Sequence, residues 1–252
     1  MSTMNDPSVD ARDAWNRLAE SYESSRVRPN SLDTLVEFPA QIEFIGRVSG
    51  KTVLDVGCGS GAKARYFASR GARRVLGVDV SDAFAEMWKA EPPLENLRLV
   101  RGDINALKDV PDLAAERFDI ILCLQVLGFA IDRAASLKAM SDLLVPDGRI
   151  VLQSPSPIRF AVEKSERFAI PFGAAYSSGG SYEYPSGWDP TVILRHQTPL
   201  ISDMLNAFAE AGLFVARCWE PEMPETARRE HPDKAAWWDK YGGVVLYELV
   251  RR

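Results

Sequence analysis

Hydrophobic positions along the chain switch between two periods, and the switch predicts a sheet covered by helices. Short β-branched runs at residues 52–56, 75–79 and 97–101 alternate with helical patterns at 61–70 and 82–90. Strands that alternate with helices in this way form parallel βαβ units. The pattern therefore predicts an α/β fold built on a parallel sheet.

The second half of the chain continues the pattern. Residues 118–124 form a long apolar run, as expected of a central parallel strand that is buried on both faces. Asp132 is expected to cap the next helix, which should end in the turn at residues 146–148, and Thr198 with Pro199 is expected to open a later helix. Further strands are expected at residues 149–153, 213–218 and 244–250.

Two segments lie outside this alternation. Residues 10–28 predict an amphipathic helix that precedes the sheet. Residues 155–199 form an irregular insertion with seven aromatic side chains among many Gly, Ser and Pro residues, which is too long for a simple connection. Such a segment is typical of a lid or binding loop, although its aromatic residues can equally give it a small core of its own. We therefore expect one domain, in the following parts: an N-terminal helical cap (1–48), a core (50–153), a lid insertion (155–199) and a C-terminal helix with strands (199–252).

Composition and charge exclude several classes of protein. The 252 residues include 30 Lys+Arg against 35 Asp+Glu, a net charge of −5, which lacks the basic excess that displaces counterions from nucleic acids. No apolar stretch is long enough to span a bilayer, and the first fifteen residues show no signal peptide. The three cysteines are widely spaced, so they indicate neither a disulfide framework nor a metal site. These features predict a cytoplasmic protein with no nucleic-acid partner, no membrane span and no metal.

A glycine-rich turn follows the first strand of the sheet. Gly57, Gly59 and Gly61 allow the backbone to turn tightly and to approach a ligand, and the helix that follows offers free N–H groups. With Ala62 the turn also satisfies the dinucleotide pattern G-x-G-x-x-G/A, and Asp79 can hold a ribose in either case. The turn by itself leaves the ligand open.

Three acidic residues at the ends of successive strands argue against a nicotinamide dinucleotide. Asp55, two residues before the first glycine, would repel a pyrophosphate and favours a cationic ligand. Asp79 and Asp103 follow the next two strands, at the edge where open α/β sheets bind ligands. The chain also has no second domain that would bring a hydride acceptor to a nicotinamide. S-adenosylmethionine, with its sulfonium, ammonium, ribose and adenine groups and no phosphate, fits these features.

The combined motifs resemble those of a class I S-adenosylmethionine-dependent methyltransferase of the small-molecule, type 11-like group. The motifs are residues 54–61, Asp79, residues 102–103 and residues 144–148. The resemblance covers about residues 50–153. It implies a Rossmann-like, seven-stranded doubly wound sheet with helices on both faces, in which all strands except the last are parallel.

The resemblance extends to both sides of this core. Residues 15–22 are similar to the N-terminal helix of small-molecule members. Residues 196–198 are similar to the start of their late helix, except that Gln197 replaces the usual Arg.

The resemblance also implies a cofactor site. Its members would be Tyr22, Asp55, Gly57, Cys58, Gly59, Asp79, Val80, Asp103, Ile104, Leu124 and Gln125. Asp55 would hold the methionine amino group together with the glycine-turn backbone, Asp79 would accept the ribose hydroxyls, and Asp103 would pair with the adenine amino group beside Ile104. Leu124 and Gln125 would border the methyl-donor end, and Tyr22 would close over the cofactor. Asp is also common in the turns after strands, and a Trp/Leu/Tyr stripe is often core packing.

The catalytic residues are less clearly marked. Methyl transfer needs no covalent intermediate, but a hydroxyl acceptor must lose its proton, which a general base assists. His196, at the end of the insertion, is the candidate base, with a purely structural role as the alternative; His231 lies in a polar stretch typical of a surface turn.

The sequence thus predicts transfer of a methyl group from S-adenosylmethionine to an oxygen, with nitrogen second, of an apolar or aromatic small molecule. S-adenosylhomocysteine would be the product. The insertion is rich in aromatic and poor in basic residues, which favours such an acceptor. The alternatives are a non-methylating reaction such as a cyclisation, and a non-catalytic partner subunit. The acceptor's identity and the oligomeric state are left open.

Overall fold

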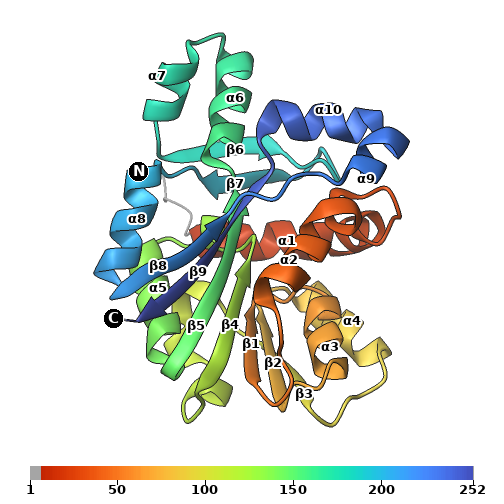
Figure 1. Ribbon diagram of the computed structural model, residues 1–252, viewed down its shortest axis with the longest axis vertical. Helices are drawn as coiled ribbons and strands as arrows, with labels where there is room; N and C mark the ends of the chain where they lie inside the picture. The colour runs from red at the N-terminus through yellow and green to blue at the C-terminus, as the bar shows by residue number, and fades with distance from the viewer. Residues whose placement is uncertain (1–6, 252) are drawn as a thin grey trace.

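A seven-stranded sheet forms the centre of the protein, whose computed structural model describes residues 7–251, with side chains from residue 11 onward (Figure 1). The strand order is β3-β2-β1-β4-β5-β9-β8, and only β9 runs antiparallel to its neighbours. The strands are β1 (Thr52–Val56), β2 (Arg74–Asp79), β3 (Leu97–Arg101), β4 (Phe118–Leu124), β5 (Leu144–Pro155), β8 (Leu213–Trp219) and β9 (Val244–Arg251). The predicted doubly wound α/β fold is confirmed. The order reverses between β1 and β4, which opens a crevice at the carboxyl ends of these strands.

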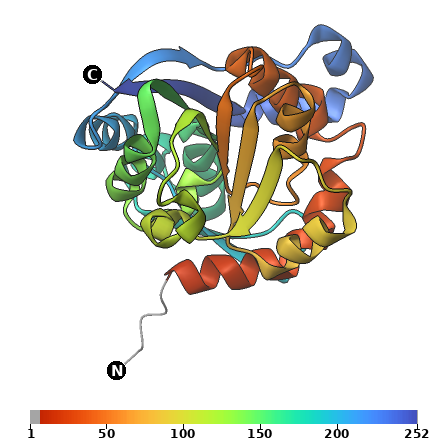
Figure 2. The ribbon, with the colours of Figure 1, turned by 90° about the horizontal axis from the view of Figure 1, so that it is seen from below.

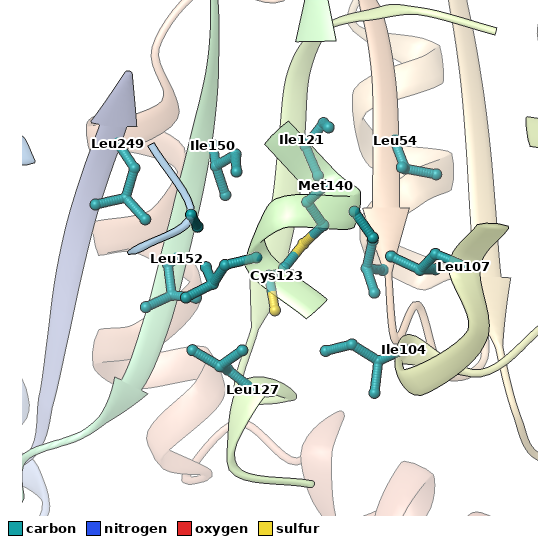
Figure 3. Close-up of a cluster of buried hydrophobic side chains, with 14 of the residues drawn as sticks. Leu54, Ile104, Leu107, Ile121, Cys123, Leu127, Met140, Ile150, Leu152 and Leu249 are labelled. Carbon is teal, nitrogen blue, oxygen red and sulfur yellow. The ribbon is translucent and has the colours of Figure 1, made fainter. Parts of the chain in front are cut away.

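Helices cover both faces of the sheet. On one face, alternate side chains of the strands pack against α2 (Phe38–Ile45) and α3 (Ala62–Ser69). On the other face they pack against α5 (Arg133–Asp142) and α8 (Ile201–Glu210). Figure 3 shows Ile121, Cys123 and Met140 in the buried cluster on this face. The helix α4 (Asp82–Ala90) lies beside β3. Short helical turns complete this part of the chain: η2 (Ile104–Asp109), η3 (Pro111–Leu113) and η4 (Leu127–Phe129).

The expected N-terminal helix is present as α1 (Pro7–Arg26), which runs along the outside of the sheet (Figure 2). The side-chain oxygen of Asn16 accepts hydrogen bonds from the backbone N–H groups of Asp82 (2.8 Å) and Ala83 (3.2 Å) and thereby caps α4. Leu18 is fully buried against Val192 and Leu194 of the insertion. A π-helical turn, η1 (Asp33–Glu37), then leads into α2. The N-terminal segment is therefore fastened to both the core and the insertion.

The insertion is not irregular, which corrects the expectation for residues 155–199. It contains α6 (Pro157–Phe168), α7 (Phe172–Ser177) and an antiparallel pair, β6 (Ser181–Pro185) with β7 (Ile193–Gln197), at the top of Figure 1. The ring of Phe160 lies 6.0 Å from those of Tyr182 and Tyr184, so the aromatic residues do form a small core. These elements are short, and they gain their stability from packing on one another, which a local period does not reveal.

Two predicted helix boundaries are also wrong. The helix α8 begins at Ile201, not at Thr198, whose hydroxyl instead donates to the carbonyl of Gly179 (3.0 Å) and accepts from the buried ammonium of Lys164 (2.8 Å). Residues 146–148 lie within β5 rather than in a turn before it. The cap at Asp132 is confirmed, because its carboxylate accepts from the backbone N–H of Ala135 at 2.9 Å.

The connection between β8 and β9 holds two helices that the sequence pattern did not predict, α9 (Glu225–Glu230) and α10 (Pro232–Tyr241). His231 lies at their junction, and Trp238 is buried in a small cluster with Val36 and Met223. Within residues 7–251 no helix is long and apolar enough to cross a membrane. In the same range, no group of three or more His, Cys, Asp or Glu side chains is placed to hold a metal ion.

Candidate functional site

One cavity lies at the carboxyl ends of β1, β2 and β4, beneath α1. It encloses about 1020 Å³ counted out to its mouth, close to the upper end of the range for ligand pockets. All eleven side chains or backbone positions predicted for the cofactor line it: Tyr22, Asp55, Gly57, Cys58, Gly59, Asp79, Val80, Asp103, Ile104, Leu124 and Gln125. The fold thus brings together residues that are up to 103 positions apart in the sequence, from 22 to 125.

The glycine-rich turn is crowded at Gly57 and Gly61, where a Cβ atom would clash with a neighbouring side chain. Gly57 has φ +72°, and a Cβ atom there would lie 2.2 Å from a methyl carbon of Val126. The backbone N–H groups of Gly57 and Cys58 donate to the carbonyl of Val78 at 2.7 and 3.1 Å, which ties the turn to β2. The first turn of α3 follows directly, and the N–H groups of a first helical turn have no partner within the helix, so they are available to a ligand.

Asp55 supplies a buried carboxylate without a partner. Only 3% of the residue is exposed, and its Oδ2 atom has no hydrogen bond in the described structure. Burial removes water from the carboxylate and raises its pKa to about 7, an effect that nearby Asp79 increases and Lys63 opposes. An unpaired buried acid is costly unless a cation or donor meets it, so this position fits a positively charged ligand group.

Asp79 is held by the backbone on both sides. Its Oδ2 accepts from the N–H of Gly59 at 2.8 Å and its Oδ1 accepts from the N–H of Ser81 at 2.9 Å. Burial raises the pKa of Asp79, while these two bonds lower it. Two carboxylate oxygens offer about four acceptor positions, so the backbone bonds leave capacity for a ligand hydroxyl group.

Asp103 performs the turn-forming role that was the alternative to ligand binding. Its Oδ1 accepts from both the backbone and the side-chain nitrogen of Asn105, at 2.8 Å each. No hydrogen bond from a described residue reaches its Oδ2 atom. Asp103 also lines the cavity, so the turn does not use the whole carboxylate.

Aromatic side chains form one wall of the cavity. Trp15 and Phe129 line it with a ring-centroid distance of 5.7 Å, and Tyr22 lies 5.3 Å from Trp15. Trp188, from the insertion, packs edge-on against Tyr22 at 4.8 Å. The sequence indicated Tyr22 but did not identify Phe129 as a wall residue or Trp188 as its support, because their contacts join segments far apart in the chain.

Two basic residues that the sequence analysis missed also line the cavity. Arg26 forms ion pairs with Glu23 (2.5 Å) and Asp33 (3.2 Å), and Lys63 pairs with the other oxygen of Asp33 at 2.8 Å. Arg26 follows Tyr22 by four positions, which places both on one face of α1; that spacing is the signal that could have found it. The two cations can attract a carboxylate group of a ligand.

His196 lies outside this cavity. It lines a separate small cavity, with its ring packed between Phe129 (5.1 Å) and Phe160 (5.0 Å). Its Nδ1 is 2.9 Å from the carbonyl of Gln197, and burial lowers its pKa to about 4. The structure therefore does not bring His196 together with the predicted cofactor residues.

Known proteins share this architecture. Residues 54–152 match a family described as a methyltransferase domain. A ubiquinone biosynthesis O-methyltransferase from Neisseria meningitidis serogroup C is 30% identical over 136 residues, a match that covers 54% of each chain. The protein thus spans about half the length of this curated relative.

Solved structures resemble the protein over most of its length. An S-adenosylmethionine-dependent methyltransferase from Mesorhizobium loti has a TM-score of 0.67 at 22% identity, covering 85% of this chain and 97% of its own. The [4+2]-cyclase SpnF has a TM-score of 0.62 at 14% identity, covering 97% and 96%. Residues 54–152 therefore resemble a methyltransferase domain, and the protein shares the fold of solved S-adenosylmethionine-dependent methyltransferases, as the motifs predicted.

Proposed function

We propose that the protein transfers the methyl group of S-adenosylmethionine to an oxygen of an apolar or aromatic small molecule. The observation that carries the proposal is the buried, unpartnered carboxylate of Asp55 beside the glycine turn, in a cavity that also presents Asp79 and Asp103. The methyltransferase-domain match and the name of the curated relative support the same reaction class.

Each polar group of the cofactor is assigned to a cavity residue of complementary charge or hydrogen-bonding capacity. Asp55 pairs with its ammonium group, Asp79 accepts the two ribose hydroxyls, and Asp103 meets the adenine amino group. Arg26 and Lys63, which also line the cavity, attract the carboxylate on the same carbon as that ammonium group. When bound, S-adenosylmethionine supplies a methyl group on a sulfonium, and transfer returns the electron pair of the broken C–S bond to sulfur as the acceptor oxygen forms the new C–O bond.

The acceptor class follows from the wall of the cavity. Trp15, Tyr22 and Phe129 present flat apolar surfaces there, and Trp188 of the insertion packs against Tyr22. Aromatic walls favour an aromatic or apolar acceptor, which they also shield from water. The insertion thus serves as a lid over the acceptor end.

The general base stays a prediction. His196 is separated from the cavity by the ring of Phe129, and a pKa of about 4 makes its imidazole a weak base. Both features weigh against direct proton transfer from an acceptor in the main cavity.

Calorimetric titration with S-adenosylmethionine, S-adenosylhomocysteine and NAD, each with wild type and with Asp79→Ala, tests the cofactor. We expect micromolar binding of the two adenosyl ligands only, with a loss of at least tenfold in the variant. Binding of NAD, or of none of the three, would refute the proposal. A panel of phenols, scored by release of S-adenosylhomocysteine, then tests the acceptor class. RNA is assayed in parallel, and methylation of RNA but of no phenol would contradict that class.

A second candidate is a cyclisation that uses the bound cofactor only as a fixed cation. A cyclisation is considered because the protein shares its fold with the [4+2]-cyclase SpnF. A methyl balance separates the two: in a cyclisation the substrate is consumed while no S-adenosylhomocysteine accumulates.

A further inference from the structure

Gln125 adopts a backbone conformation that side chains other than glycine rarely take. It follows the last residue of β4, lines the cavity and has φ +67°, one of two positive values among the described non-glycine residues. Its backbone N–H donates to the carbonyl of Gln153 at 2.9 Å. Such strain persists only where surrounding contacts impose it, and it is common at functional sites.

A buried polar network holds the side chain of Gln125. Its Nε2 donates to the Oε2 of Glu37 at 3.2 Å, and the Nε2 of Gln153 donates to the same oxygen at 2.8 Å. The Oε1 of Gln153 in turn accepts from Gln41 at 2.7 Å, and both of these glutamines are fully buried. Glu37 is thus fixed from the ends of two neighbouring strands, 88 positions away from Gln125 in the sequence.

The carboxylate determines which end of the Gln125 carboxamide faces the cavity. A carboxylate only accepts hydrogen bonds, so it takes the NH₂ group and turns the carbonyl oxygen away from itself. No described residue donates to the Oε1 of Gln125, although the residue lines the cavity. At the end of β4 we therefore infer that the Gln125 carbonyl oxygen, a hydrogen-bond acceptor, faces the cavity.

This orientation matters for an incoming nucleophile. A carbonyl oxygen accepts a hydrogen bond from the O–H or N–H group that is to be methylated. The lone pair on that oxygen or nitrogen then stays free to attack the methyl group. An NH₂ group in the same place would donate to that lone pair and weaken it as a nucleophile.

We propose that Glu37 is a positioning residue that holds Gln125 so that its carbonyl oxygen orients the O–H of the methyl acceptor. This inference rests on the proposed function. It limits the acceptors to molecules that donate a hydrogen bond from the atom to be methylated. The O–H proton, released on transfer, passes to water.

Side-chain amide resonances of Gln125 test the positioning without any acceptor. They are recorded on the full chain with S-adenosylhomocysteine and identified by their absence in Gln125→Asn, which tolerates a positive φ but is one methylene shorter. Glu37→Leu should shift them to the positions of free glutamine and speed their solvent exchange about tenfold. Glu37→Gln should preserve them, because one carboxamide oxygen can accept both donors. Glu43→Leu, a change at an exposed glutamate of α2, is the matched control.

Unaltered Gln125 resonances in Glu37→Leu would overturn the proposal. If that variant does not fold, the wild type decides: slowed exchange of the Gln125 amide protons supports the contact, and exchange as fast as in free glutamine overturns it.

Turnover tests the functional half, with the phenol that is methylated fastest in the acceptor panel. Glu37→Leu and Gln125→Asn should each lower kcat about tenfold, with no further loss in the double variant. The Kd of S-adenosylhomocysteine should stay within threefold of wild type in Glu37→Leu, because Glu37 does not line the cavity. Glu37→Gln should keep kcat within threefold of wild type. The positioning role of Glu37 would be overturned if the losses of kcat added up in the double variant, or if Glu37→Gln were as slow as Glu37→Leu. Should no phenol be methylated, the proposed acceptor class has failed, and the resonances decide the role of Glu37 by themselves.

Discussion

The buried carboxylate of Asp55 predicts that cofactor affinity depends on pH. Its pKa is about 7 in the ligand-free protein because burial disfavours the charged form. A bound ammonium group favours the charged form and lowers that pKa. Below pH 7 a proton must therefore leave as the ligand binds, so affinity should rise with pH and level off above pH 7.

The size of the effect follows from the pKa. If the pKa falls well below 6 in the complex, the Kd at pH 6 should exceed that at pH 8 about tenfold, or about 1.4 kcal/mol. Calorimetric titration with S-adenosylhomocysteine at pH 6, 7 and 8 measures it, and buffers of different ionisation enthalpy report the released proton directly.

Asp55→Asn is the matched control, because it keeps the shape of the side chain but cannot titrate. Its Kd should be weaker at pH 8 and nearly independent of pH, so that any remaining slope reports Asp79 or the ligand itself. The reasoning would be refuted by equal Kd values at pH 6 and 8 in the wild type, or by the same slope in the variant.

Three further measurements test the stability effect of Asp55 and two other parts of the structure. The pKa of Asp55 is about 7 in the folded protein, above its usual value of 3.8. The ionised group therefore destabilises the free protein increasingly between about pH 4 and 7, by about 1.4 kcal/mol per pH unit. Asp55→Asn should raise the urea midpoint at pH 8 but not at pH 4. Gly57→Ala should lower the free energy of unfolding by roughly 1–3 kcal/mol more than Gly212→Ala, because both glycines have a positive φ but only Gly57 meets Val126; equal losses in urea titrations would show that the contact relaxes. His196→Gln should leave kcat within about threefold and the Kd of S-adenosylhomocysteine unchanged, whereas a tenfold loss of kcat would assign the base role to His196 after all.

The strands of the core and much of the proposed cofactor site are readable in the sequence because their signals are local. Strand period is set by alternate burial along a few residues, and the predicted strands at residues 52–56, 97–101 and 118–124 match β1, β3 and β4 residue for residue. Parallel strands bring their carboxyl ends to one edge, so Asp55 and Asp79 had to meet once the strands were recognised.

Tertiary packing decided the rest. The insertion folds because short helices and strands bury aromatic rings against one another, and these ring contacts join residues that are separated in the chain. Packing also placed His196 behind Phe129 and brought Arg26 into the cavity. The hydrogen bond between Glu37 and Gln125 depends on where a π-helical turn meets the end of β4. Contacts of this kind join residues that are distant in the chain, and their formation depends on how whole elements pack rather than on any spacing within the sequence.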